Sequence, residues 1–162
     1  MNWEIKVPTP EDAPDIVGLI RIGIEERAFH DRVISLEDAL EYAFSSPPKG
    51  YNLFICLIEN EIAGYIDGLV GKRGVGIVTG ICVRPEHRRK GVGEQLMGRI
   101  LDQFRLGECH KARTEVFADN QGAIRFYLRC DFIQEGYLKK DEGKRDVIIM
   151  GRFLEVLEEN TP

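Results

Sequence analysis

The stretch from Thr79 to Ile100, TGICVRPEHRRKGVGEQLMGRI, constrains the fold most. It joins an apolar, β-rich run to a proline, a group of cations, two glycines and a helical pattern. Pro85 cannot donate a hydrogen bond to a strand ladder, so we expect the strand to end near Arg84. The segment therefore predicts a strand that passes through a basic turn into a helix.

The basic turn has two interpretations. Arg88, Arg89 and Lys90 precede Gly91 and Gly93, where the missing side chains let a ligand approach the backbone. The first amides of a helix have no partner inside it, and the helix dipole makes that end positive. Together with the cations, they suit an anion such as a phosphate group. The alternative is a solvated basic turn whose glycines ease the helix start, and charge and glycine content alone do not separate the two.

The length and charge of the chain exclude some classes of protein. Its 162 residues suit one domain with a sizeable core, so we expect a single domain over residues 1–162. A net charge of −5 argues against a general nucleic-acid binder, which usually carries a basic face. No apolar stretch approaches the length that a bilayer requires, and the N-terminus lacks a basic region followed by an apolar one. We therefore expect a cytoplasmic protein without a membrane partner.

The order of expected elements combines paired strands with strands that alternate with helices. The expected strands are Trp3–Val7, Asn52–Ile58, Ile62–Val70, Val75–Val83, Ala112–Phe117, Phe132–Tyr137 and Asp146–Arg152. The expected helices begin after the N-cap Thr9, at Ser35, at Gly93 and at Asn120, and a charged loop is expected over Lys139–Arg145. This order predicts an α/β protein with a mixed sheet and helices on both of its faces.

The cysteines and histidines give no sign of a metal site. The four cysteines are widely scattered and form no Cys-x-x-Cys pair, so we expect buried free thiols, with a disulfide or a metal site as the alternative. The three histidines show no metal-ligand spacing, so we expect no metal. These residues are Cys56, Cys82, Cys109 and Cys130, and His30, His87 and His110.

The pattern Arg88-x-x-Gly91-x-Gly93, after a strand that ends in Val83-Arg84-Pro85, resembles the acetyl-CoA signature of the GNAT superfamily of N-acetyltransferases. The resemblance covers the order of elements over roughly residues 52–152 and is sharpest over roughly residues 81–132. It implies a central mixed, mostly antiparallel sheet flanked by helices on both faces, with a splayed slot for acetyl-CoA. The pair Thr79-Gly80 favours a β-bulge, which would open this slot.

A second segment extends the resemblance. Asn120, followed by a helix with Phe126 and Tyr127, resembles the superfamily's second conserved segment. The spacing of Glu115, Asn120 and Tyr127 is similar to that of the ribosomal-protein N-terminal alanine acetyltransferases, as is the ending Asp146–Met150. Two departures are Asp131-Phe132, where the superfamily often has Gly-Phe, and Tyr137-Leu138, where the N-terminal acetyltransferases often carry Tyr-Tyr.

The resemblance implies where acetyl-CoA binds. The pantetheine arm would lie along Ile81, Cys82 and Val83 and pair with their backbone, and the amide of Val83 would stabilise the carbonyl oxygen as it gains charge. Arg88 would contribute its positive charge to the phosphate site. The pyrophosphate would lie on the amides of Arg89, Lys90, Gly91, Val92, Gly93 and Glu94.

Tyr127 is implied as the acid that protonates the departing thiolate. The reference pKa of a phenol is about 10, above about 8.5 for a thiol, so the hydroxyl stays protonated at neutral pH. The alternative is a core aromatic, since Ala123, Phe126, Tyr127 and Cys130 share helical spacing.

Glu115 is the candidate base. An ordinary glutamate is too weak to deprotonate an alkylammonium directly, so it would need burial or a water relay. The alternative is a strand-end carboxylate that orients substrate or pairs with an arginine. Asn120 would bond to backbone or to the cofactor's amide, and an acyl-enzyme on Cys82 is disfavoured because no histidine is near it in sequence.

These implications predict transfer of the acetyl group from acetyl-CoA to a primary amine by direct attack in a ternary complex. The acceptor would be a protein N-terminus; the alternatives are a small-molecule amine, or a non-catalytic acyl-CoA-sensing module of the same fold. The sequence leaves a homodimer open. Four acidic residues would attract a cationic amine or form a solvated face: Glu25, Glu26, Asp31 and Asp67.

Overall fold

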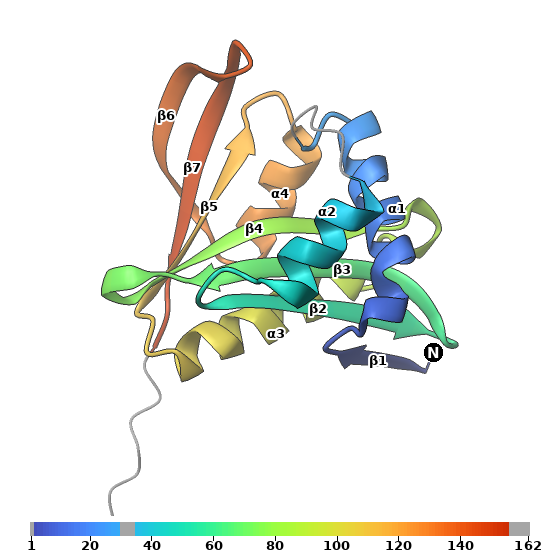
Figure 1. The fold of residues 1–162 in the computed structure, drawn as a ribbon. Coiled ribbons are helices and arrows are strands. Elements are labelled where there is room, and N and C mark those ends of the chain that lie inside the picture. Colours follow the sequence, from blue (N-terminus) through green and yellow to red (C-terminus); the bar gives the residue numbers. More distant parts are fainter. Residues whose placement is uncertain (1, 30–34, 156–162) are drawn as a thin grey trace, which may run out of the picture.

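The computed structural model describes residues 2–29 and 35–155. Within them, seven strands form one sheet in the order β1-β2-β3-β4-β5-β7-β6 (Figure 1). The strands are β1 (Trp3–Lys6), β2 (Tyr51–Ile58), β3 (Glu61–Val70), β4 (Val75–Val83), β5 (Lys111–Phe117), β6 (Ile133–Glu142) and β7 (Arg145–Phe153). Neighbours are antiparallel except β4 and β5, which are parallel. The expected mixed, mostly antiparallel sheet is confirmed.

Helices cover both faces of the sheet, as expected. One face carries α1 (Ala13–Glu25) and α2 (Leu36–Leu40), and the other carries α3 (Val92–Leu106) and α4 (Gln121–Arg129) (Figure 1). The predicted cap residues are found at their starts. Ser35 accepts a hydrogen bond from the amide of Asp38 at 3.0 Å, and Thr9 caps a short turn that leads into α1.

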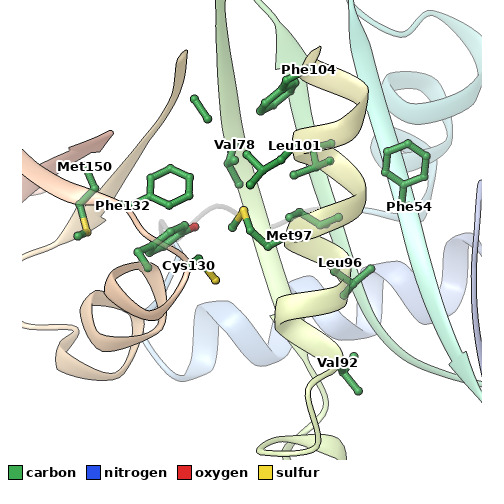
Figure 2. Packing of buried hydrophobic residues seen from close by; sticks show 14 of the residues in the cluster. Phe54, Val78, Val92, Leu96, Met97, Leu101, Phe104, Cys130, Phe132 and Met150 are labelled. Atoms are coloured by element: carbon green, nitrogen blue, oxygen red, sulfur yellow. The ribbon is translucent and has the colours of Figure 1, made fainter. Parts of the chain in front are cut away.

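The larger core lies between α3 and the sheet (Figure 2). Leu96, Met97 and Phe104 of α3 are at most 1% exposed and pack towards Phe54 and Val78 of the sheet. This face of α3 is amphipathic at helical spacing, so burial of its apolar stripe fixes the helix on the sheet. The N-terminus of α3 is thereby held at a defined place beside the end of β4.

The sheet opens between β4 and β5. These strands pair only over Val75–Ile77 and Lys111–Arg113 and diverge beyond (Figure 1). Asp67 of β3 pairs with Gly80, but the next residue, Gly68, pairs with Val78, so Thr79 is an extra residue in β4. The bulge expected at Thr79-Gly80 is confirmed, and bulges bend and twist the strand that carries them.

The expected charged loop over Lys139–Arg145 is wrong. β6 continues to Glu142, and the turn to β7 is short, with Gly143 at φ +54° and Lys144 at φ +65°. β6 is an edge strand, and its charged residues are mostly exposed. Charged residues are tolerated on an edge strand, because they face solvent and discourage pairing with other chains. The same charged residues were the reason for predicting a loop from the sequence.

Candidate active site

A cavity of about 1040 Å³ lies at the opening between β4 and β5. Its walls come from α1 and α2 on one face of the sheet and from the starts of α3 and α4 on the other. The cavity brings together ten of the residues that the sequence assigned to the cofactor or to catalysis: Ile81, Cys82, Val83, Arg88, Arg89, Gly93, Glu94, Glu115, Asn120 and Tyr127. Lys90, Gly91 and Val92 do not line it, and Val92 is buried in the core.

The backbone of β4 presents hydrogen-bonding groups to this cavity. The amide of Arg84 donates to the carbonyl of Ala63 on β3 at 2.8 Å. Because bonded and non-bonded pairs alternate in an antiparallel ladder, the backbone groups of Val83 and Ile81 point away from β3. They face the side where β5 has diverged, so an extended ligand can pair with this strand edge.

The turn into α3 supplies a second set of backbone donors. Gly91 is the N-cap at φ +82°, a left-handed conformation that favours glycine, and the first helical bond runs from Gln95 to its carbonyl at 3.0 Å. The amides of Val92, Gly93 and Glu94 therefore have no partner within the helix. These amides are available to an anion, and the anion site at the helix start stays a prediction.

Arg88 is committed to other contacts. Its Nε donates to the carbonyl of Val83 at 2.9 Å, and its two terminal nitrogens donate to Glu26 at 3.0 and 2.8 Å. The hydrogen bonds to Glu26 raise the pKa of Arg88 further, so it stays charged. The side chain predicted to face a phosphate thus connects the end of β4 to the end of α1, and Arg89 and Lys90 remain exposed cations in the turn.

The sequence did not single out three further arginines. Arg113 of β5 and Arg125 and Arg129 of α4 line the same cavity. All three are exposed, and the sequence showed them only as cations next to the motif segments. Glu94, by contrast, lies 3.5 Å from Arg129, so its negative charge at the helix start is partly offset.

Tyr127 is a core aromatic that also lines the cavity, and its role as an acid stays a prediction. Its ring is buried and packs edge-on against Phe126 and Phe132, with centroids 5.4 and 5.3 Å away. Its hydroxyl lies 3.4 Å from Thr114 Oγ1, which donates to the carbonyl of Val78 at 3.1 Å. Burial raises the pKa of Tyr127 to about 12, so the proton stays on the phenol at neutral pH.

Glu115 and Asn120 occupy different settings. Glu115 lies on β5 opposite Ile149, and its side chain lines the cavity but is exposed. Of the two conditions named for a base at this position, burial and a water relay, the exposed side chain leaves the water relay. Asn120 is the N-cap of α4, and its Oδ1 accepts from the amide of Ala123 at 3.1 Å, which is the predicted backbone role.

The four acidic residues expected near the acceptor lie in different surroundings. Glu26 is paired with Arg88, and Glu25 is exposed on α1. Asp67 lines the cavity beside Tyr51, whose hydroxyl donates to it at 2.9 Å. Asp31 lies outside the described residues.

The four cysteines are buried free thiols, as expected. Burial raises the pKa of Cys82 to about 11, which disfavours the thiolate that an acyl-enzyme route would need. In the described ranges, no three His, Cys, Asp or Glu residues gather as a possible metal site; His30 lies outside those ranges. No helix in the described part of the chain is long and apolar enough to cross a membrane.

Comparison with known proteins defines the family. The pattern of the Acetyltransferase (GNAT) family matches residues 19–132, which is more than half of the chain, so the protein belongs to this family. The resemblance inferred from the motifs is thereby confirmed. The fold agrees, because the structure of yncA from Salmonella typhimurium with its cofactor acetyl-CoA superposes with a TM-score of 0.82, covering 100% of this chain and 98% of that one at 19% identity.

Curated relatives match part of the chain. One is a spermidine N(1)-acetyltransferase of Vibrio cholerae, 34% identical over 77 residues, which are 47% of this chain and 42% of the relative. Another is the [ribosomal protein bS18]-alanine N-acetyltransferase of Escherichia coli, 31% identical over 74 residues, 43% of this chain and 50% of the relative. The chain spans about half the length of the curated relatives it matches.

Proposed function

We propose that this protein transfers the acetyl group of acetyl-CoA to a primary amine by direct attack in a ternary complex. One observation carries the proposal: the opening between β4 and β5 exposes a strand edge that leads directly to the unpartnered amides at the start of α3. A long ligand with a peptide-like arm at one end and phosphates at the other fits this arrangement, in which a free strand edge is followed by free helix amides. Family membership and the fold shared with a structure that holds acetyl-CoA support it.

The cofactor would use the two sets of backbone groups in turn. Its pantetheine arm would pair with Ile81 and Val83 of β4, as an added strand does. Its pyrophosphate would accept hydrogen bonds from the amides of Val92, Gly93 and Glu94 at the positive end of the helix. Arg89 and Lys90 would add charge, and Arg88 would act by fixing the turn.

The chemistry needs a held carbonyl and a protonated leaving group. The amide of Val83 would stabilise the carbonyl oxygen as it gains charge, an effect worth about 3 kcal/mol. The hydroxyl of Tyr127 would donate to the departing sulfur. Glu115 would move protons through water, because its exposed side chain reaches solvent directly.

For the acceptor we propose a protein N-terminus first and a small amine second. The alanine acetyltransferase of Escherichia coli supports the first, together with the spacing of Glu115, Asn120 and Tyr127. The spermidine acetyltransferase of Vibrio cholerae supports the second. Both acceptors present a primary ammonium group at neutral pH, and we propose that they are met in the cytoplasm.

Two measurements test the proposal together. Acetyl-CoA should raise the melting temperature of the purified protein, because a ligand of the folded state stabilises it by mass action. A panel of short peptides and small amines should then release free CoA above the rate of hydrolysis. Stabilisation by acetyl-CoA with no turnover of any acceptor would favour the acyl-CoA-sensing alternative, and no stabilisation would reject the cofactor site.

A further inference from the structure

A half-buried carboxylate forms part of the cavity wall on the face of α1 and α2. Asp67 of β3 pairs with Gly80 of β4, directly before the segment proposed to hold the cofactor. A Cβ placed on Gly80 would lie 2.9 Å from Asp67 Oδ1 and 3.0 Å from the hydroxyl of Tyr65. The glycine therefore makes room for both oxygens against the backbone of β4.

The carboxylate of Asp67 has no cationic partner. Within residues 2–29 and 35–155, no Lys, Arg or His nitrogen lies within 4.0 Å of its oxygens, and its side-chain donors include the hydroxyl of Tyr51. Burial raises the pKa of Asp67 to about 6, although hydrogen bonds from Thr79 and Tyr51 act against that rise. At neutral pH an unpaired negative charge thus remains in a partly dry site, which is costly unless a ligand supplies the cation.

Aromatic rings surround this end of the cavity. Tyr42 packs edge-on against Tyr51 at 5.1 Å, and Phe29 packs edge-on against Tyr65 at 6.5 Å between ring centroids. All four rings line the cavity. Aromatic faces attract alkylammonium ions, and together with one carboxylate they make a site suited to such a cation.

Charged side chains of both signs line the cavity. The arginines are Arg88, Arg89, Arg113, Arg125 and Arg129, and the carboxylates are Glu26, Asp38, Asp67, Glu94, Glu115 and Glu142. Glu26 pairs with Arg88 and Glu94 with Arg129, whereas Asp67 contacts the aromatic cluster through the hydroxyl of Tyr51. A cationic acceptor would therefore be attracted by Asp67 itself.

The groups that face Asp67 also connect it to the reacting centre. The charge of Asp67 is among the causes that raise the pKa of Tyr127, the proposed donor to the leaving sulfur. The titratable and charged groups on its side of the cavity come from β2, β3, α2 and its continuation, and α4: Tyr51, Tyr65, Asp38, Tyr42 and Tyr127.

We propose that Asp67 binds the acceptor amine as an ammonium ion in this aromatic pocket and accepts its proton before attack. The inference rests on the proposed acetyl transfer and adds the acceptor site to it. The acceptor class is an unhindered alkyl primary amine with its positive charge at the reacting end. Neutral or anionic groups of the same shape are excluded because they leave the carboxylate unpaired.

The step balances as follows. One proton of the ammonium moves to the carboxylate of Asp67, which frees the nitrogen lone pair to form a bond to the thioester carbon. The carbon–sulfur bond breaks, and the sulfur receives the proton of Tyr127. The second proton that the nitrogen loses returns to Tyr127 through water. The products are the amide and free CoA, and Asp67 releases its proton to solvent.

A binding experiment tests the site without turnover. At pH 8 and constant ionic strength, n-butylamine should raise the melting temperature of the wild type, whereas 1-butanol should not. Asp67→Asn should lose the rise, and Glu25→Gln, which removes an exposed charge of α1 that does not line the cavity, should keep it. Tyr51→Phe removes the hydroxyl that stabilises the charged carboxylate. When the pH is lowered, this variant should therefore lose half of its amine binding at a higher pH than the wild type does.

A kinetic experiment separates this inference from the proposed function. With an accepted amine, Asp67→Asn should raise the amine KM at least tenfold and remove the fall in rate below about pH 6, while acetyl-CoA stabilises the variant as before. Unchanged amine binding and turnover in Asp67→Asn would overturn the amine site and leave acetyl transfer standing. Amine binding that depends on Asp67, with no turnover by the wild type, would support the site and reject the transfer.

Discussion

Arg88 and Glu26 form a two-bond ion pair, with nitrogen–oxygen distances of 3.0 and 2.8 Å, between the turn after β4 and the end of α1. The same guanidinium holds the carbonyl of Val83 through its Nε at 2.9 Å. The first arginine of the cofactor motif thus fixes the strand end whose amide is proposed to hold the thioester. Its effect on acetyl-CoA would be indirect.

This relationship predicts parallel effects from the two partners. Glu26→Gln and Arg88→Gln should both weaken CoA binding, about fivefold, because each releases the turn; a pair this exposed is worth about 1 kcal/mol at most. Isothermal titration with CoA checks this prediction. Tighter binding in Glu26→Gln would mean that the freed Arg88 contacts phosphate directly, and would refute the indirect role.

Gly91 provides a cleaner test of the phosphate site than Gly93. A Cβ on Gly93 would lie 2.9 Å from the ring of Phe126 on α4, so any substitution there also disturbs helix packing. Gly91 has open space around its Cβ position and is constrained by its φ of +82°. Gly91→Val should lower the free energy of unfolding by about 1–2 kcal/mol and abolish stabilisation by acetyl-CoA.

Gly91→Asn is the matched control, since asparagine tolerates the left-handed conformation better than valine does. It should retain part of the melting-temperature rise with acetyl-CoA. Full stabilisation of Gly91→Val by acetyl-CoA would show that the amides at the start of α3 do not hold the cofactor.

Local chemistry made the central part of the fold predictable from sequence. Pro85 and Gly91 mark the end of β4 and the start of α3, and the structure places both boundaries within a residue or two of the expected ones. The bulge at Thr79-Gly80 was predictable for the same reason, because a glycine in a strand marks such irregularities.

Contacts between distant residues were not predictable. Arg88 meets Glu26, which lies 62 positions earlier, and no local pattern pairs them. The environment of Asp67 depends on Tyr51 from one neighbouring strand and on the space beside Gly80 from the other. In the sequence, Asp67 was one of several acidic residues and could not be told apart from them. In the structure it differs from them because it is partly buried and has no cationic partner.

Asp67 should give the stability of the protein a specific pH dependence. Its pKa rises on folding from 3.8 to about 6, so its stabilising contribution is complete below about pH 4 and is lost as the pH rises through about 6. Removing the charge should therefore stabilise the apo protein in neutral solution. We expect Asp67→Asn to raise the free energy of unfolding at pH 8 by up to about 3 kcal/mol.

The same substitution should give little stabilisation at pH 4, where Asp67 is protonated in the folded state and carries no buried charge. Thermal melts of the wild type and Asp67→Asn across pH 4–8 measure the difference, with Glu25→Gln as the exposed control. A difference in melting temperature between Asp67→Asn and the wild type that does not grow with pH would contradict the raised pKa of Asp67.

Glu115 is expected to act through water, since its side chain is exposed. Glu115→Gln should lower turnover by about tenfold, and most at low pH, where neutral amine is scarce. The affinity for acetyl-CoA should barely change. Rates of CoA release from pH 6 to pH 9 measure the effect, and equal rates for the wild type and Glu115→Gln at every pH would return the residue to a structural role.

Tyr127→Phe separates the two roles of the buried tyrosine. The substitution keeps the ring that packs against Phe126 and Phe132 and removes only the hydroxyl beside Thr114. If that hydroxyl protonates the leaving thiolate, turnover should fall by roughly two to four powers of ten. The KM for acetyl-CoA should stay nearly constant, because the proton transfer belongs to the transition state.

Stability should respond little to the same change. The contact between the hydroxyl and Thr114 Oγ1 is long, at 3.4 Å, so its loss should cost at most about 1 kcal/mol of unfolding free energy. Thr114→Val is the control, since it removes the neighbouring hydroxyl but leaves that of Tyr127 in the cavity, and it should retain most of the activity. Full turnover in Tyr127→Phe would reduce the tyrosine to a core residue and require another donor for the sulfur.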